Sequence, residues 1–275
     1  MTEPTVVTLA DPEACAVAAA ERIVEILDVA IDDRGEAHWV TTGGSAPAGI
    51  YRQLASDPLR GELDWRKVRL WFTDERFVPP ENPLSNAKIA FDLLLDAAAF
   101  GGYSGTGQSG VDVERGRDPG VPIRADHYHP FPVAAAIGEG RDNHWAAARY
   151  AAEIREDGVE ENDDGLPTFD LMLLGVGPDG HILSVFPGSE AFDEDAWAVG
   201  VPAPTHVEPH VARATLNPAL VPAAHELLVV ATGAAKADVL KDVLQSPIEP
   251  RRLPAQLARR PGATWILDRA AAAAL

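Results

Sequence analysis

The chain has 275 residues, of which 46% are hydrophobic, so it is long enough to bury a large core. Its formal net charge of −19 opposes binding to nucleic acid phosphates or anionic membrane surfaces, and an anionic ligand must be met by a few local donors. Cys15 is the only cysteine, which excludes an intramolecular disulfide and a thiolate zinc cluster and is typical of a reducing cytoplasm.

The N-terminal region predicts a long helix rather than a targeting segment. Asp11 is a candidate N-cap, Pro12 suits the first turn, and apolar residues recur at helical spacing until Gly35. The stretch lacks a basic n-region, and Glu21, Arg22 and Glu25 interrupt its apolar residues, which therefore form no continuous apolar span. We therefore expect neither a signal peptide nor a membrane-spanning helix.

Four β-rich runs follow, and each is succeeded by a loop. They are HWVTT (38–42), KVRLWF (67–72), FDLMLLGVG (169–177) and ELLVVA (226–231), and ATWILD (263–268) predicts a last strand. Helical periodicity resumes after the loops, and the alanine-rich tail after Asp268 is predicted to be a closing helix. This alternation predicts an α/β fold, a doubly wound, mainly parallel sheet with helices on both faces, whose ligands bind at the carboxyl ends of the strands.

One segment does not share this pattern. Residues 100–122 (FGGYSGTGQSGVDVERGRDPGVP) are rich in glycine and polar residues and show no period, so they predict an extended loop or insertion. We expect the rest of residues 1–275 to form a single domain around it.

The turn GGSAP places Gly43, Gly44 and Ser45 between a strand and a helix. Glycines allow close approach of a ligand, and the free amides of a helix N-terminus favour a phosphate. Glycine in such a turn can also serve geometry alone. The stretch matches neither the P-loop nor G-x-G-x-x-G nor G-x-S-x-G, which argues against ATP, a dinucleotide and a serine hydrolase.

The stretch TDER places Asp74, Glu75 and Arg76 directly after the second strand. The guanidinium of Arg76 could hold a phosphate or a carbonyl oxygen through its fork of donors. The alternative is a surface cluster of salt bridges without a function.

The stretch GVGPDGH is the most informative one. Gly175, Gly177 and Gly180 predict a tight turn that presents His181, and Asp179 is close enough to orient the imidazole. Histidine titrates near neutral pH and can accept a proton from water. The alternative is a loop histidine without a task.

Further charged residues complete the set of candidates. Arg213 and Lys236 could each bind a phosphate, although residues of this kind are often merely solvated. His127 and His129 form a possible metal pair, but two histidines are too few ligands, and we expect no metal site.

Together these stretches resemble the 6-phosphogluconolactonase family, within the larger group that includes glucosamine-6-phosphate isomerase/deaminase. The matching segments run in family order from about residue 5 to the C-terminus, and only the 100–122 region lies outside the pattern. They are TTGGSAP, WFTDERFVP, SNAKIAFDLLL, FDLMLLGVGPDGHILSVFPGS, ARATLNPALV, TGAAKADVL and the terminal LPAQL and TWILD.

The resemblance implies an enzyme that hydrolyses 6-phospho-D-glucono-1,5-lactone to 6-phosphogluconate in the pentose phosphate pathway. It implies no required cofactor, a cytoplasmic location, and a monomer or small homo-oligomer that binds neither nucleic acid nor membrane. It implies His181 as the general base with Asp179 beside it, and Arg76 in the active cleft. The phosphate site that it implies comprises Gly43, Gly44, Ser45, Arg213 and Lys236, and Asp74 and Gly177 also belong to the cleft.

The chain departs from the family pattern in one place, and two alternatives stay open. The family's turn more often reads D-G-H-T-A-S, whereas Ile182 and Leu183 follow His181 here. In the deaminase branch a glutamate in an N-E-P element joins the catalytic relay, but this chain reads SVFPGS and has no glutamate before Glu190. A non-catalytic sugar-phosphate sensor would need a DNA-binding segment, and no basic helix-turn-helix is evident.

Overall fold

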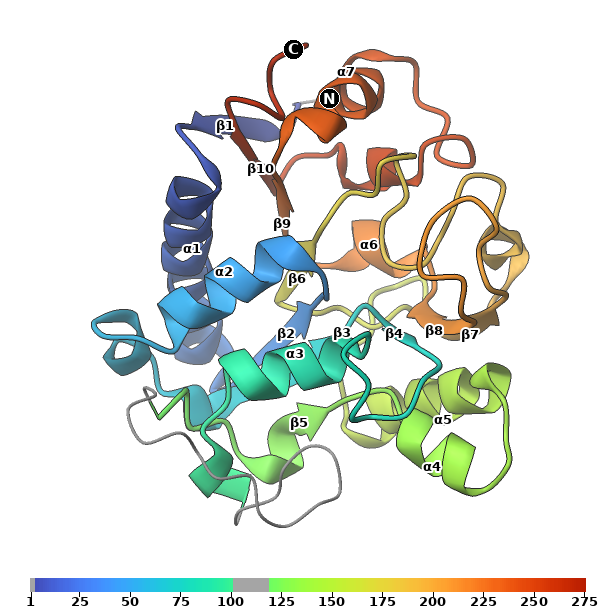
Figure 1. Cartoon of the computed structure of the whole chain (residues 1–275). Coiled ribbons are helices and arrows are strands. Elements are labelled where there is room, and N and C mark those ends of the chain that lie inside the picture. The colour runs from blue at the N-terminus through green and yellow to red at the C-terminus, as the bar shows by residue number, and fades with distance from the viewer. Residues whose placement is uncertain (1–2, 101–118) are drawn as a thin grey trace.

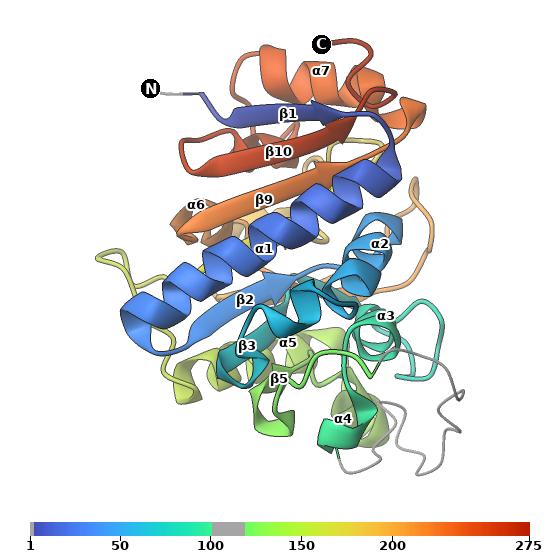
Figure 2. The ribbon, with the colours of Figure 1, turned by 90° about the vertical axis from the view of Figure 1, so that its left-hand side faces the viewer.

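A seven-stranded parallel sheet forms the centre of the protein (Figures 1 and 2). The structure is a computed structural model that describes residues 3–100 and 119–275. Every neighbouring pair in the sheet is parallel. The strands lie in the order β1 (Thr5–Leu9), β10 (Ala263–Asp268), β9 (Glu226–Ala231), β6 (Leu171–Leu174), β2 (Ala37–Thr41), β3 (Val68–Phe72) and β5 (Tyr128–His129). The predicted doubly wound α/β fold is confirmed.

Helices cover both faces of this sheet. In Figures 1 and 2, α1 (Pro12–Arg34) and α2 (Ser45–Leu54) lie on one face, and α5 (Asn143–Glu156), α6 (Leu220–Ala223) and α7 (Ala237–Gln245) lie on the other. The remaining helices, α3 (Asn86–Leu93) and α4 (Val133–Gly138), pack against α2 and α5 respectively. Because both faces are covered, the central strands are buried and read as apolar runs, for example the LMLL of β6.

The long first helix begins and ends where its sequence indicates. Asp11 accepts a hydrogen bond from the backbone N–H of Ala14 at 2.9 Å, and Gly35 closes the helix with a φ of 88°, a conformation that favours glycine. Its buried face packs on α2 and on the strands β2, β9 and β10. The prediction of a helix between Asp11 and Gly35 is confirmed.

A second, smaller sheet was not predicted. The strands β4 (Asp74–Arg76), β8 (Arg213–Leu216) and β7 (Ala198–Val201) pair antiparallel in that order. The prediction placed Arg76 directly after a strand and assigned Arg213 to no element, whereas these two arginines are register partners on neighbouring strands. The two positive side chains are therefore brought together by backbone pairing.

Three further expectations concern the C-terminal tail, the glycine-rich segment and membrane-spanning helices. The tail after Asp268 forms turns and no helix, because Asp268 accepts the N–H of Ala271 at 2.7 Å and so short a segment gains little from helix formation. The predicted glycine-rich loop at 100–122 lies outside the described residues except for residue 100 and residues 119–122. In the part of the chain that is described, no helix is long and apolar enough to cross a membrane.

The strand order identifies a switch point at the centre of the sheet. From β2 the chain proceeds outward through β3 to β5, and it then returns to β6 on the other side of β2 and proceeds through β9 to β10. The loops that leave β2 and β6 therefore diverge from neighbouring strands. In open α/β sheets a crevice forms at this position, outside the carboxyl ends of the strands.

Candidate active site

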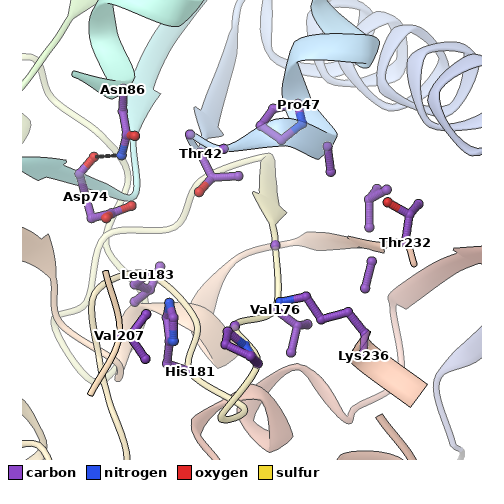
Figure 3. A pocket seen from close by; sticks show the side chains of 18 of the residues that line it. Thr42, Pro47, Asp74, Asn86, Val176, His181, Leu183, Val207, Thr232 and Lys236 are labelled. Carbon is purple, nitrogen blue, oxygen red and sulfur yellow. Dashed lines mark hydrogen bonds between the residues drawn. The ribbon is translucent and has the colours of Figure 1, made fainter. Parts of the chain in front are cut away.

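A cavity of about 260 Å³ occupies the switch point between β2 and β6 (Figure 3). Its walls come from the loops after β2, β6 and β9, from β4 and β8, and from residues 207–208. Eight of the ten predicted site residues line it: Gly43, Gly44, Asp74, Arg76, Gly177, His181, Arg213 and Lys236. The other two adjoin it, because Asp179 is hydrogen-bonded to His181 and Ser45 begins α2 after Gly44.

The turn after β2 requires its glycines. A Cβ on Gly43 would lie 1.7 Å from Oδ1 of Asn86, and Gly44 has a φ of 106°, which side chains rarely adopt. No side chain caps the start of α2 at Gly44, so the first N–H groups of this ten-residue helix are not satisfied by a side-chain cap. Such a helix start favours an anionic group at the mouth of the turn.

The turn after β6 presents His181 in a fixed orientation. Nδ1 of His181 lies 2.5 Å from Oδ1 of Asp179, and the N–H of Gly177 donates to the carbonyl of His181 at 2.8 Å. A Cβ on Gly177 would lie 2.0 Å from Nδ1 of His181, so the imidazole packs directly on the glycine backbone. The ring is therefore held from two sides, by Asp179 and by the backbone of Gly177.

The charge of Asp179 determines which nitrogen of His181 carries the proton. Burial alone would raise the pKa of Asp179, but hydrogen bonds from His181 and His206 outweigh it and hold the pKa well below its usual range. A carboxylate only accepts hydrogen bonds, so Nδ1 of His181 must be the donor. The lone pair of Nε2 is then available, since no residue that the structure describes bonds to it.

The residues after His181 shape the wall of the cavity. Ile182 is buried in the core, whereas Leu183 lines the cavity with a φ of 55°, in the left-handed region that non-glycine residues seldom occupy. The departure from the family's usual turn therefore places a larger apolar side chain, leucine instead of alanine, in the wall beside the Asp179–His181 pair.

The two arginines are anchored by backbone carbonyls. Nη1 of Arg76 donates to the carbonyl of Leu84 at 2.7 Å, and Nη2 of Arg213 donates to that of Pro209 at 3.1 Å. Burial lowers the pKa of Arg213, and its guanidinium lies 5.2 Å from the ring centroid of Phe186. No carboxylate of the described residues forms a salt bridge with either guanidinium.

The two carboxylates of the TDER stretch are buried and serve the framework. Asp74 accepts hydroxyl hydrogen bonds from Ser184 at 2.6 Å and Thr73 at 2.8 Å, and its carbonyl accepts Nδ2 of Asn86 at 2.9 Å (Figure 3). Glu75 is 3% exposed and accepts four hydrogen bonds, three from the start of α3 and one from the N–H of Arg76. Burial raises the pKa of Glu75 to about 7, although four donors favour its ionised form. The alternative of an exposed salt-bridge cluster is wrong.

Lys236 supplies a cation to the cavity. Its chain segment leaves β9 through Gly233, whose N–H donates to Oδ1 of Asp268 at 3.0 Å. Burial lowers the pKa of Lys236, and the charge of Asp179 opposes this shift. Figure 3 shows Lys236 and His181 extending into the cavity, with Thr42 and Pro47 on the opposite wall. No salt bridge within the described residues neutralises the ammonium group of Lys236.

Sequence reasoning missed the segment between β7 and β8. His206 donates to Asp179 at 2.8 Å, and Val207 and Glu208 line the cavity. This segment has no hydrophobic period and lies almost thirty residues from the DGH turn, so no local signal pointed to it. Asn86 was likewise missed, although it lines the cavity and packs against Gly43.

The two histidines considered for a metal lie elsewhere. Nδ1 of His129 is 2.9 Å from Oε1 of Glu153, and the ring stacks on Trp71 with centroids 3.9 Å apart. His127 is buried beside this cluster. Within residues 3–100 and 119–275, no group of three or more histidine, cysteine or acidic residues is placed to hold a metal ion.

Comparison with known proteins identifies the family of this chain. Residues 10–266 match the family described as glucosamine-6-phosphate isomerases/6-phosphogluconolactonase. The chain belongs to this family. A Streptomyces coelicolor protein named 6-phosphogluconolactonase is 34% identical over 277 aligned residues, which cover 99% of this chain and 95% of that protein.

Solved structures of family members share the fold over their whole length. The 6-phosphogluconolactonase from Trypanosoma cruzi superposes with a TM-score of 0.81 at 27% identity and covers 99% of this chain, with 97% of its own length matched. A monomeric glucosamine-6-phosphate deaminase superposes with a TM-score of 0.71 at 18% identity, over 98% of this chain and 100% of its own. At 18% identity the second likeness shows the fold alone.

Proposed function

We propose that this chain hydrolyses 6-phospho-D-glucono-1,5-lactone to 6-phospho-D-gluconate, with His181 as the general base that activates water. The observation that carries the proposal is the oriented imidazole, whose Nδ1 is held by Asp179 while Nε2 is available at a cavity that Lys236 also lines. A neutral histidine beside a bound ester, with a carboxylate behind it, is suited to general base catalysis near neutral pH.

The cavity offers separate places for the two ends of this substrate. The phosphate is placed at the Gly43–Gly44 turn and the start of α2 at Ser45, with the ammonium of Lys236 as its counter-charge. Arg213 adds a second positive charge on the β8 side. The lactone carbonyl then lies beside His181 and Arg76. Fixing the phosphate at one end orients the ester at the other.

Hydrolysis follows as general-base ester chemistry. Nε2 of His181 takes a proton from water while the water oxygen bonds to C1 of the lactone and the carbonyl electron pair moves onto oxygen. Arg76 or loop amides stabilise this oxyanion. The carbonyl then re-forms, the bond from C1 to the ring oxygen breaks, and the ring oxygen takes the proton from His181 to leave as the C5 hydroxyl. No covalent enzyme intermediate forms.

The deaminase alternative lacks its relay residue. Glu190 is the first glutamate after the DGH turn, and it is exposed at the start of a short 3₁₀ segment, Glu190–Asp193, rather than in the cavity wall. Glu208 lines the cavity but forms no hydrogen bond to His181 in the described structure. The similar Streptomyces coelicolor protein is named as a lactonase, and this supports the same assignment for the present chain.

Several wider features belong to the same proposal. We propose one domain over residues 1–275, a monomer or small homo-oligomer, and no required cofactor. A cytoplasmic location rests on the single cysteine and on the family's reaction. The charge of −19 disfavours nucleic acid as a partner.

The test is lactonase activity on 6-phosphogluconolactone generated in situ by glucose-6-phosphate dehydrogenase, measured against spontaneous hydrolysis. We expect the wild type to accelerate the reaction and His181→Ala to lose about 10²–10⁴ of that rate while retaining phosphate binding. Equal acceleration by both proteins would refute His181 as the base. Acceleration by neither would refute the lactonase assignment and favour the sensor alternative.

A further inference from the structure

A second histidine contacts the carboxylate that orients the base. Asp179 uses Oδ1 for Nδ1 of His181 at 2.5 Å and Oδ2 for Nε2 of His206 at 2.8 Å. His206 comes from the segment between β7 and β8, which the sequence analysis did not connect with the site. The two imidazoles thus share one carboxylate from opposite sides.

The aromatic ring of Phe186 strengthens this arrangement. Its centroid lies 4.5 Å from that of His181 and 5.7 Å from that of His206, where the two planes meet edge to face at 80°. His206 is therefore fixed at its nitrogen by Asp179 and at its ring by Phe186, although its side chain is 51% exposed. An exposed histidine with two defined contacts has a set position, unlike one in free solvent.

We propose that His206 is a positioning residue for the reaction: it holds the second oxygen of Asp179 and thereby sets both the orientation and the basicity of His181. This inference rests on the proposed lactonase function. His206 touches neither the reacting atoms nor Nε2 of His181, so its effect passes entirely through Asp179.

The sign of the effect follows from the shared charge. A hydrogen bond from His206 stabilises the negative charge of Asp179, which weakens the attraction of that charge for a proton on His181. If His206 is removed, His181 is the one hydrogen-bonding partner of Asp179 left among the described residues, and the protonated form of His181 is favoured. Less of the enzyme then holds the free base at a given pH.

Other charges also act on this carboxylate. Lys236 and Arg213 interact electrostatically with Asp179, and Glu208 lies two residues from His206 on the same segment. All three remain when His206 alone is replaced. A change in the pH profile of such a variant therefore reports the His206–Asp179 contact.

The experiment compares His206→Ala, His206→Gln and wild type for kcat and KM from about pH 5 to 9. We expect His206→Ala to lower kcat about tenfold with KM within about twofold, and to move the acid limb of kcat/KM to higher pH. His206→Gln restores both values, because Nε2 of glutamine can donate where Nε2 of histidine does.

Two controls separate this role from general loosening of the segment. His210→Ala removes a contact at 2.7 Å to the carbonyl of Pro204 in the same segment, and His225→Ala removes an exposed histidine just before β9. Neither is expected to move the acid limb. An equal shift in His210→Ala would overturn the proposal, as would an unmoved limb in His206→Ala or a failure of His206→Gln to restore it.

A measurement without substrate keeps the inference distinct from the lactonase assignment. In NMR titrations of ring-labelled histidine, the His181 signal, assigned by its absence in His181→Ala, should titrate at higher pH in His206→Ala than in wild type. This shift is expected even if the wild type proves inactive on the lactone. Identical titrations would refute the coupling.

Discussion

Within the described residues, His181 and His129 each pair with a carboxylate through Nδ1, in very different surroundings. In the cavity, Nδ1 of His181 lies 2.5 Å from Asp179, and in the core Nδ1 of His129 lies 2.9 Å from Glu153. The ring of His129 stacks on Trp71 at 3.9 Å, and its Nε2 is buried with no hydrogen-bond partner among the described residues and with Oδ2 of Asp157 3.8 Å away. His181 instead lines the cavity, where its Nε2 is available. A pair of this kind can serve catalysis only where the second nitrogen can reach a substrate.

The largest effect on kcat is expected for Asp179→Asn, which removes the carboxylate from the pair in the cavity. An amide that donates to Nδ1 forces the proton of His181 onto Nε2, the nitrogen that must accept one from water. We expect kcat to fall by about 10²–10⁴ with little change in the urea-unfolding midpoint. Glu153→Gln is the matched control in the core pair, and unchanged kcat there together with a large loss in Asp179→Asn would support the distinction. Equal losses in both would contradict it.

His129→Ala tests the core pair from the other side. Loss of the stack on Trp71 and of the bond to Glu153 should lower the free energy of unfolding by about 3 kcal/mol. The rate constant per folded molecule should not change. Urea unfolding followed by circular dichroism and kcat at a temperature far below the transition measure the two quantities. A fall in kcat without a fall in stability would show that the core pair takes part in catalysis.

Gly177→Ala tests whether the close packing of His181 on the backbone of the turn is needed for kcat. The new Cβ would stand 2.0 Å from Nδ1 of His181, so the imidazole or the turn must shift away from Asp179. A displacement of about 1 Å at a catalytic group can lower kcat about 100-fold. Gly138→Ala is the control, because a Cβ there meets no atom within 4 Å and the backbone has ordinary φ. A wild-type kcat in Gly177→Ala would show that the turn accommodates the added Cβ without loss of activity.

The smallest expected effect is the pH dependence of the stability that His38 contributes in the core. Nδ1 of His38 accepts Nε1–H of Trp71 at 3.2 Å, and burial lowers the pKa of His38, opposed by Asp170, Glu36 and Asp157 and aided by Arg69. The folded state thus binds the proton less tightly than the unfolded chain. This contribution is full above about pH 6.5 and is lost as the pH falls toward the lowered pKa in the folded state.

His38→Asn measures this contribution, because its amide oxygen can still accept from Trp71 but does not titrate. The difference in unfolding free energy between wild type and His38→Asn should shrink as the pH falls below about 6.5. Taking the difference removes the opposing contribution of Glu75, whose raised pKa of about 7 makes its folded form bind a proton more readily. A difference that is constant with pH would refute the role of His38.

The fold was predictable where strands are apolar and long enough to carry a pattern. The runs around β2, β3, β6, β9 and β10 met that condition, and their common carboxyl edge predicted that the loops with Gly43, His181 and Lys236 would meet. The edge strand β1 was not predicted, because its residues are mostly exposed and alternate too weakly. The tail after Asp268 was predicted wrongly from alanine content, which favours a helix only when the segment is long enough to form one.

The missing parts of the site depend on pairing at long range. The three residues of β4 are polar and too few to show a period, and they become a strand only through β8, more than one hundred residues later. The contact of His206 with Asp179 likewise leaves no trace in local sequence. Patterns identify the elements that a chain forms by itself, whereas contacts between irregular segments require coordinates.

The position of the cavity at the switch point has a consequence for refolding. Gly43 and Lys236 are about two hundred residues apart in the sequence, and the strands that carry their loops become neighbours of a common cavity only when β6 and β9 have joined β2. Parallel pairings of such long range form slowly because a large loop must close before they contribute. Recovered enzymatic turnover should therefore lag behind recovered helical signal, and a sugar phosphate should stabilise only the fully assembled sheet.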